Sequence, residues 1–341
     1  MKQGVVKGIR PLWTGLRECF NVEGSPIPCQ GSGQDPEFRL QRMWPPNRFI
    51  VKGDVVLDEL TGLSWTRDAN LFGFPATWSE AISYIHDMNR NGAFGYRDWR
   101  LPNRREMRSL LDLGEKRPSL PKGHPFLNVF NGWYWTSTTF SGFTNYAWWV
   151  HLEGARMFYG RKDQYAIFWP VRGEDKGVLL ATGQARCYDA SGKEIDCTGC
   201  GQDGEYRLGH WIEEGRFETL DRHVVLDRLT GLLWTKSADL ANGPVSWDEA
   251  LKVVKEMNSS DTAYETPWRL PTINELESLV HCDYSFPALP PRHPFEHLQE
   301  VYWSSTTSIY ETDWAWALYL GKGATGVGKK DVARFWVWAV R

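Results

Sequence analysis

The sequence predicts an α+β fold in two tandem copies. Each copy has two helices and a mainly antiparallel sheet, and a short hairpin with paired cysteines precedes it. Trp-Arg-Leu-Pro occurs at residues 99–102 and again at 268–271, and similar residues surround both sites in the same order. Within each copy, strand-like runs are followed by two helical patterns and then by more strand-like runs. That order is typical of α+β folds and not of alternating βαβ units.

The duplication divides the 341 residues into four segments. We expect a Cys-containing leader at 1–47, a first domain at 48–174, a linker with a second leader at 175–216, and a second domain at 217–341. No run approaches the ~18 apolar residues of a membrane helix. Met1–Val6 lacks the apolar core of a signal peptide, so either the protein is not secreted or its signal peptide is not present in this chain.

The leaders are predicted to be turn-rich hairpins. Cys19-Phe20 and Cys29 recur as Cys187-Tyr188 and Cys197, with nine residues between the cysteines in both copies. Gly, Pro, Ser and Asp dominate these segments, and these residue types favour turns.

The first strands and the first helix follow the leaders. Residues 55–58 and 61–65 read as two short strands joined by a turn, and 224–227 and 230–234 repeat them. Thr77 with Glu80 three residues later has the spacing of a helix capping box. The spacing of the apolar residues that follow predicts one buried helix face, formed by Ala81, Ile82, Ile85 and Met88.

A second helix begins directly after Trp-Arg-Leu-Pro, with Asn103 or Thr272 as its cap. We expect Arg100 to pair with Glu106, and the second-copy arginine with its matching glutamate, which would tie the loop to the helix. Four strand-like runs then complete the first copy, at 133–138, 146–152, 155–160 and 165–172.

The six cysteines favour disulfides. We expect three bonds: 19–29, 187–197 and 200–282 (Cys19, Cys29, Cys187, Cys197, Cys200, Cys282). The third rests on the fact that Cys200 and Cys282 are both missing from the first copy. Zinc is the rival interpretation, because Cys197-x2-Cys200 has ligand spacing, with Cys187, His281 or Cys282 as further candidates. Free thiols are the third alternative.

Charge separates the two copies. Of the 39 Lys and Arg, 22 lie in residues 1–174 with 17 of the 42 Asp and Glu, so this part has a net charge of +5 and the remainder −8. Because both copies share a fold, this difference concerns partners more than folding. The chain as a whole is mildly acidic, which argues against nucleic acid as a partner.

Basic residues cluster on the second helix of the first copy. These are Arg97, Arg104, Arg105 and Arg108, where the second copy has Thr266, Ile273, Asn274 and Glu277. A solvated basic helix would explain the pattern without any function. The alternative is a patch for sulfate or phosphate groups, which the planar Arg side chain suits. A second basic candidate is the set Arg156, Arg161 and Lys162, matched in part by Lys329 and Lys330.

Residues 136–149 mix aromatic and hydroxyl side chains, and Tyr146 and Trp148 are candidate ligand-binding residues. Aromatic rings beside hydroxyls suit sugar stacking or a protein interface. Alternation of core and surface positions on a strand explains the pattern equally well. The same choice applies to the 19 Trp residues, for which we expect packing roles.

Five motifs, each present in both halves, carry a family resemblance: Thr-Gly-Leu-x-Trp, Trp-x-Glu-Ala, Trp-Arg-Leu-Pro, Tyr-Trp-(Ser/Thr)-Ser-Thr-Thr and Trp-Pro-Val-Arg, which in the second copy is Trp-Ala-Val-Arg. Together they resemble the Legionella collagen-like protein C-terminal (Lcl C-terminal) domain family, over 50–172 and 219–341. The arrangement also resembles the C-type-lectin-like fold. The resemblance implies a bacterial secreted or cell-surface module for adhesion, and a glycan or surface protein as its partner.

The resemblance does not imply an enzyme. Formylglycine-generating enzymes, which share the lectin-like fold, bind copper with a late cysteine pair, whereas residues 30–186 contain no Cys and the second half has one late Cys. No nucleophile-elbow motif and no calcium loop with regularly spaced Asp occurs. We therefore expect a non-enzymatic binding module without cofactor or metal. The alternative is a structural subunit of a surface complex or filament, a homo-oligomer that uses Trp-rich faces and the opposite domain charges.

Overall fold

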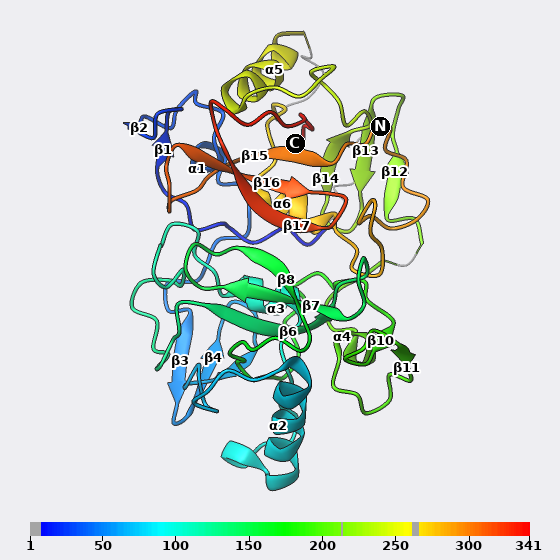
Figure 1. The fold of residues 1–341 in the computed structure, drawn as a ribbon. Helices are drawn as coiled ribbons and strands as arrows, with labels where there is room; N and C mark the ends of the chain where they lie inside the picture. The colour runs from blue at the N-terminus through cyan, green and yellow to red at the C-terminus, as the bar shows by residue number, and fades with distance from the viewer. Residues whose placement is uncertain (1–7, 213, 261–265) are drawn as a thin grey trace. The chain divides into compact units, whose positions relative to one another are not determined.

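The structure is a computed structural model, and it describes residues 8–212, 214–260 and 266–341. Met1–Val6, the stretch relevant to a signal peptide, lies outside the described residues. The fold is α+β and consists of two repeated domains, as the element order predicted (Figure 1). The chain forms two compact units, which are described separately below.

The units do not follow the order of the segments in the chain. The first-domain unit comprises Trp44–His210 with the short segment His281–Tyr284. The second-domain unit comprises Met1–Met43, Trp211–Val280 and Ser285–Arg341. Each leader therefore packs onto the domain of the other repeat: the first leader completes the second domain, and the second leader completes the first.

The first-domain unit has two sheets and two main helices. The sheet of order β3-β4-β5-β9 is antiparallel, and β6, β7 and β8 form an antiparallel meander. The elements of the domain are β3 (Phe49–Lys52), β4 (Val55–Asp58), β5 (Ser64–Thr66), α2 (Trp78–Asn91), the short 3-10 helix Ala93–Gly95, α3 (Arg104–Ser109), β6 (Trp133–Thr139), β7 (Tyr146–His151), β8 (Met157–Arg161) and β9 (Val171–Arg172). Those of its leader are β10 (Cys187–Tyr188), β11 (Glu194–Ile195) and α4 (Asp203–Tyr206).

The second-domain unit repeats this plan. Its leader contains β1 (Cys19–Phe20), β2 (Pro26–Ile27) and α1 (Asp35–Phe38). Its domain contains β12 (Phe217–Thr219), β13 (Val224–Asp227), β14 (Leu232–Thr235), α5 (Trp247–Ser260), α6 (Ile273–Ser278), β15 (Val301–Thr307), β16 (Trp314–Tyr319) and β17 (Ala324–Lys329). Strands β15, β16 and β17 form the antiparallel meander that matches β6–β8.

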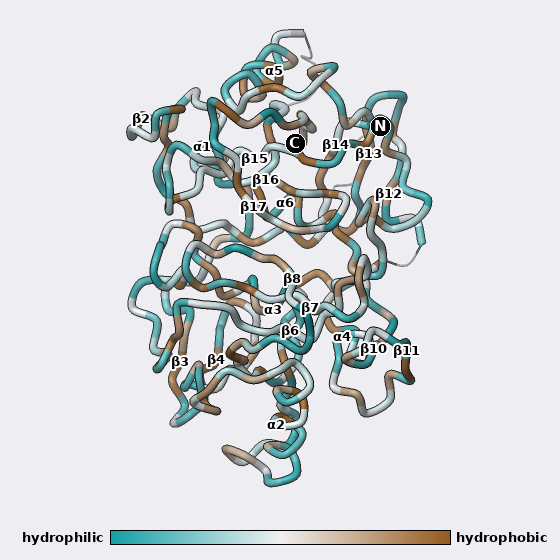
Figure 2. Tube along the Cα trace, viewed as in Figure 1, coloured by the Kyte–Doolittle hydropathy of each residue, from teal (hydrophilic) through white to brown (hydrophobic). Residues whose placement is uncertain are grey.

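Helix α2 forms as its sequence predicted. Thr77 Oγ1 accepts the Glu80 amide and the Glu80 carboxylate accepts the Thr77 amide, so the capping box is complete. The four apolar residues of the predicted face are buried. They join a core that includes Trp99, Trp135 and Phe168. Hydrophobic and hydrophilic colours alternate along both α2 and α5 in Figure 2, as expected for helices with one face on a core.

One predicted strand is largely wrong. The run 165–172 forms a strand only at Val171–Arg172. Its earlier part makes single bridges instead, Ala166 with Ala76 and Ile167 with Tyr134, because it crosses between two different neighbours and follows neither for long.

The leaders are held by the same contacts in both units. Asp35 Oδ2 accepts hydrogen bonds from the hydroxyls of Thr14 and Thr306, both at 2.8 Å. Lys330 Nζ donates to the carbonyls of Phe20 and Asn21, both at 3.1 Å. The Asp35 carboxylate and the Phe20 carbonyl of the first leader are thus held by Thr306 and Lys330 of the second domain.

The first-domain unit repeats this arrangement. Asp203 Oδ2 accepts hydrogen bonds from Thr138 at 2.6 Å and Thr182 at 2.7 Å. Lys162 Nζ donates to the carbonyls of Tyr188 and Asp189, at 3.0 and 3.2 Å. Because the contacts match atom for atom, the exchange of leaders is reciprocal.

The disulfides 19–29 and 187–197 are present, as predicted, and each closes a leader hairpin. The predicted 200–282 bond is wrong, since neither Cys200 nor Cys282 forms a disulfide. Cys200 lies in the turn after Cys197, whose carbonyl accepts its amide at 3.2 Å. Cys282 is buried elsewhere in the unit, where its amide donates to Thr182 and its sulfur lies 3.9 Å from Arg104 Nη1. Their joint absence from the first copy therefore does not reflect a bond.

Candidate functional site

Trp-Arg-Leu-Pro has the structural role predicted for it. Arg100 makes two parallel hydrogen bonds to Glu106, at 2.7 and 2.8 Å, and a third to the Gly173 carbonyl. Arg269 and Glu275 repeat the pair, with both bonds at 2.6 Å. Both arginines are buried, so the motif orients the loop and the following helix and presents nothing to solvent.

The predicted anion patch on α3 is wrong, because Arg104, Arg105 and Arg108 are all buried. The Arg104 guanidinium carbon lies 3.9 Å from the ring centroid of Trp148, which is itself buried. Arg105 Nε donates to the carbonyl of Ala181 in the second leader, at 3.0 Å. The six-residue helix lies between the β6–β7 sheet and this leader, so both partners cover side chains that were expected to face water.

Two other predicted basic residues are exposed but belong to no common site. Arg97 Nη1 donates to the carbonyls of Asn89 and Arg90 and so closes the end of α2. Arg156 lies in the turn before β8, opposite His151. Lys162 is buried over Trp78, with its amine on the leader carbonyls, and burial lowers its pKa to about 7. It stabilises the leader and is not a surface ligand.

The remaining predicted residues, Tyr146, Trp148 and Arg161, lie together on one face of β7 and β8. Tyr146 is opposite Arg161, and Trp148 is opposite Tyr159. Phe140 stacks on Tyr159 with ring centroids 3.9 Å apart and an interplanar angle of 7°. Phe140 and Tyr159 also pack edge-on against the buried Trp148, at 5.5 and 5.6 Å. We call Phe140, Phe143, Tyr146, Trp148 and Tyr159 the aromatic cluster.

The turn between β6 and β7 brings one end of this cluster, Phe143 and Tyr146, to the surface. The Tyr146 amide donates to Phe143 O and the Phe140 amide to Tyr146 O, which closes a tight loop. A Cβ at position 142 would lie 2.5 Å from the Phe140 ring, so only glycine allows Phe140 to fold over the loop. Phe143 at the tip is 57% exposed, and Tyr146 is half-buried beside it with the rings 5.9 Å apart.

Arg161 adds positive charge at the edge of the cluster. Its side chain is about half exposed and pairs with Asp163, which raises the pKa of the guanidinium. The site thus combines an exposed ring, two phenol hydroxyls and one guanidinium. Such a set can stack on an apolar face and hydrogen-bond to hydroxyl or anionic groups, but it contains no activated nucleophile or acid–base pair.

The second copy lacks this cluster. At the matching positions it has Ser308, Glu311 and Val327 in place of Phe140, Phe143 and Tyr159. These three aromatic residues were not predicted as a site, because the charge difference on α3 is the more obvious contrast between the two copies. The signal was available, since the same comparison of the two copies shows three aromatic side chains lost in one short region.

The expectation that Trp residues pack in the cores is confirmed. Each of them is buried or half-buried, and Trp65, Trp78 and Trp135 are among the fully buried side chains. Within the part of the chain that the structure describes, no cluster of three or more His, Cys, Asp or Glu side chains could hold a metal ion. Over the same residues, no helix has both the length and the apolar character needed to cross a membrane.

The family profile of the Lcl C-terminal domain matches residues 54–172 and 223–341. The chain belongs to the Lcl C-terminal domain family. The two matches confirm the tandem duplication and place the aromatic cluster inside the first Lcl C-terminal domain. No curated protein matches the chain in a sequence search. The family suggests an adhesion-like module, and the disulfides of the leaders are compatible with an extracellular protein.

Proposed function

We propose that the chain is a non-enzymatic, extracytoplasmic adhesion module that binds glycans through the aromatic cluster of its first Lcl C-terminal domain. One observation carries this proposal: Phe143 is exposed at a loop tip, directly beside Tyr146 and Arg161, which face each other across two strands. A pyranose ring can stack on Phe143 while the Tyr146 hydroxyl and the Arg161 guanidinium reach its substituents. The C-type-lectin-like architecture that the sequence resembles is part of the proposal.

The proposal differs from a patch formed by the basic helix. A site on α3 would bind through charge alone and would weaken steeply with salt. The aromatic cluster contributes stacking, which salt does not screen, and a single exposed Arg161. We therefore expect binding of both neutral and sulfated sugars, with a modest preference for the sulfated form.

Calorimetric titration of the full chain with matched sulfated and unsulfated oligosaccharides tests this. Phe143→Ala should weaken binding of both sugars roughly tenfold, and Arg161→Gln should weaken only the sulfated one, by about threefold. Glu311→Ala and Lys329→Gln change the second-copy positions that match Phe143 and Arg161, and serve as controls. Binding that is unaffected by Phe143→Ala, or that is lost equally in the controls, would refute the assignment.

A second candidate is assembly with other copies or with a surface partner. It is favoured by two exposed rings, Phe74 (71% exposed) and Tyr165 (68% exposed), which flank the bridge between Ala76 and Ala166. An interface there predicts concentration-dependent oligomers that Phe74→Ser with Tyr165→Ser abolishes, measured by light scattering after gel filtration. A chain that is monomeric at all concentrations excludes self-assembly.

A further inference from the structure

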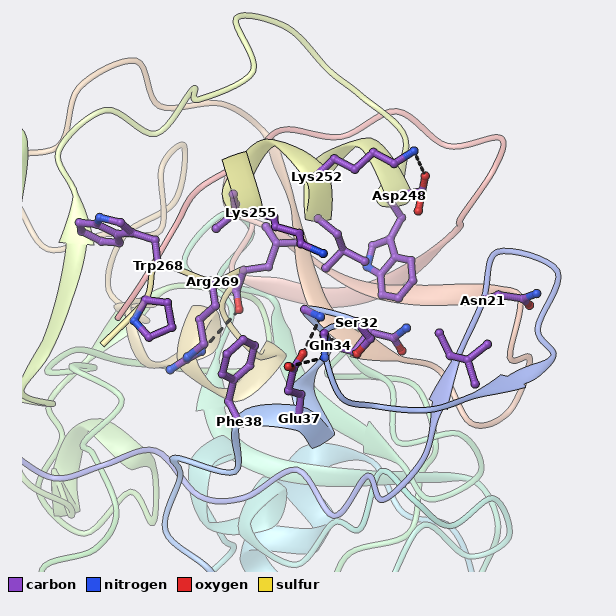
Figure 3. Close-up of a pocket in the computed structure, with 18 of the residues that line it drawn as sticks. Asn21, Ser32, Gln34, Glu37, Phe38, Asp248, Lys252, Lys255, Trp268 and Arg269 are labelled. Atoms are coloured by element: carbon purple, nitrogen blue, oxygen red, sulfur yellow. Dashed lines mark hydrogen bonds and ion pairs between the residues drawn. The ribbon is translucent and has the colours of Figure 1, made fainter. Parts of the chain in front are cut away.

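A cavity of about 550 Å³ lies in the second-domain unit, between the first leader and helix α5 (Figure 3). The leader contributes β1, β2 and α1, and the domain contributes α5 with the Pro267–Leu270 segment. Its walls are mostly apolar, formed by Phe20, Ile27, Phe38, Trp247, Leu251 and Trp268. This volume and character are those of small-molecule sites in proteins.

Most polar groups that line the cavity are already bonded within the protein. The Gln34 amide bonds both backbone groups of Phe20, and the Glu37 carboxylate accepts the amides of Gly31 and Gly33. The Asn258 amide bonds both backbone groups of Trp268. These groups shape the walls and have little capacity left for a ligand.

The two lysines of α5 that line the cavity differ in whether their charge is paired within the protein. Lys252 forms an ion pair with Asp248 one turn earlier. Lys255 extends from α5 over the cavity toward Ser32 and Glu37, as Figure 3 shows. Among the described residues, no hydrogen-bond or ion-pair partner of Lys255 is found. Lys255 is therefore the charge that the cavity offers to a ligand.

The matching place in the first-domain unit is filled differently. Position 255 corresponds to His86, and a Cβ on Gly201 would lie 2.9 Å from both the His86 ring and the Ile82 methyl group. In the second-domain unit the same test at Gly33 meets only Leu251, at 3.3 Å. The leader and helix are thus in closer contact where His86 stands, and the second copy carries Lys255 at the same position.

We propose that this cavity binds a small amphipathic organic anion, with an apolar ring or short acyl body between the leader and α5. Its carboxylate, sulfate or phosphate group pairs with Lys255. Glu37 restricts the anionic group to the α5 side, because the carboxylate repels it from the leader side. This site is separate from the aromatic cluster, lies in the other unit, and does not depend on glycan binding.

Two fluorescent probes with one body test the proposal: anilinonaphthalene sulfonate, which is anionic, and phenylnaphthylamine, which is not. Both are titrated into the folded full chain. Lys255→Gln should weaken binding of the anionic probe roughly fivefold and leave binding of the uncharged probe unchanged. Lys252→Gln, on the same helix but paired with Asp248, is the control and should change neither probe.

Leu251→Trp fills the cavity from α5 and should weaken both probes at least tenfold. Ile27→Trp fills it from the leader and gives the same test if the first variant folds poorly. If Leu251→Trp and Ile27→Trp both bind the two probes as tightly as the wild type does, the proposed binding site is refuted. It is also refuted if the wild-type chain binds neither probe. Equal weakening of the two probes by Lys255→Gln overturns the assignment of an anionic ligand.

Discussion

The buried carboxyls that anchor the leaders predict an unusual dependence of stability on pH. Burial raises the pKa of both Asp35 and Asp203 from 3.8 to about 6, although hydroxyls of two Thr residues donate to each carboxylate. A pKa raised by folding means that the folded state binds protons more tightly than the unfolded chain. The stability that each group contributes is therefore present at low pH and is lost as pH rises through about 6.

The magnitude follows from the two pKa values. For one carboxyl that shifts from 3.8 to about 6, the free energy of unfolding should be about 1.3 kcal/mol larger at pH 5 than at pH 7. Asp203→Asn removes the titration but keeps an oxygen that accepts from Thr138 and Thr182. The variant should therefore lose this difference between pH 5 and pH 7 while retaining the leader contact.

The assay is urea unfolding of the wild type and of Asp203→Asn at both pH values, followed by Trp fluorescence. Other titrating groups are common to both proteins and cancel in the comparison. Asp54→Asn removes an exposed carboxyl from the same unit and is the control. If Asp203→Asn shows the same change in stability between pH 5 and pH 7 as the wild type, the carboxyl is not desolvated as described.

Three further predictions concern the packing of α3 and the leaders. Arg104→Glu places a carboxylate against Trp148 and should destabilise the unit by about 3–5 kcal/mol in urea unfolding, whereas a surface patch would lose binding alone. Lys162→Met removes the donor to the leader carbonyls, and hydrogen exchange of β10 should become at least tenfold faster while that of β1 stays unchanged. Non-reducing mass spectrometry should find two disulfides and two thiols, with half-buried Cys200 alkylated in the folded protein and buried Cys282 only after unfolding; six thiols would contradict the disulfides of the leaders.

Local elements could be predicted because their signals are local. The capping box at Thr77 and Glu80 and the apolar spacing of α2 need only neighbouring residues, and both were predicted correctly. The Arg100–Glu106 pair lies within six positions of sequence and was also predicted. The disulfides within each leader could be predicted for the same reason, since each closes a loop of ten positions.

The remaining features depend on contacts between distant segments. Arg105 is buried under the second leader, where it donates to the carbonyl of Ala181, 76 positions further along the chain. The spacing of residues on a short helix cannot indicate that so distant a segment will cover it. The exchange of leaders could not be predicted from sequence patterns either. Two copies with matching contacts would satisfy the same hydrogen bonds whichever domain each leader met.

The reciprocal exchange of leaders has a consequence for how the chain is made. The first leader emerges before any of the domain that covers it, and its anchor to Lys330 can form only after a residue 310 positions beyond Phe20 has been synthesised. The first domain in turn lacks its cover until Asp203 has emerged. Each half on its own therefore lacks the residues that anchor its leader, because those residues lie in the other half. The linker between the two repeats therefore acts as a tether that keeps each leader at high local concentration near its distant partner.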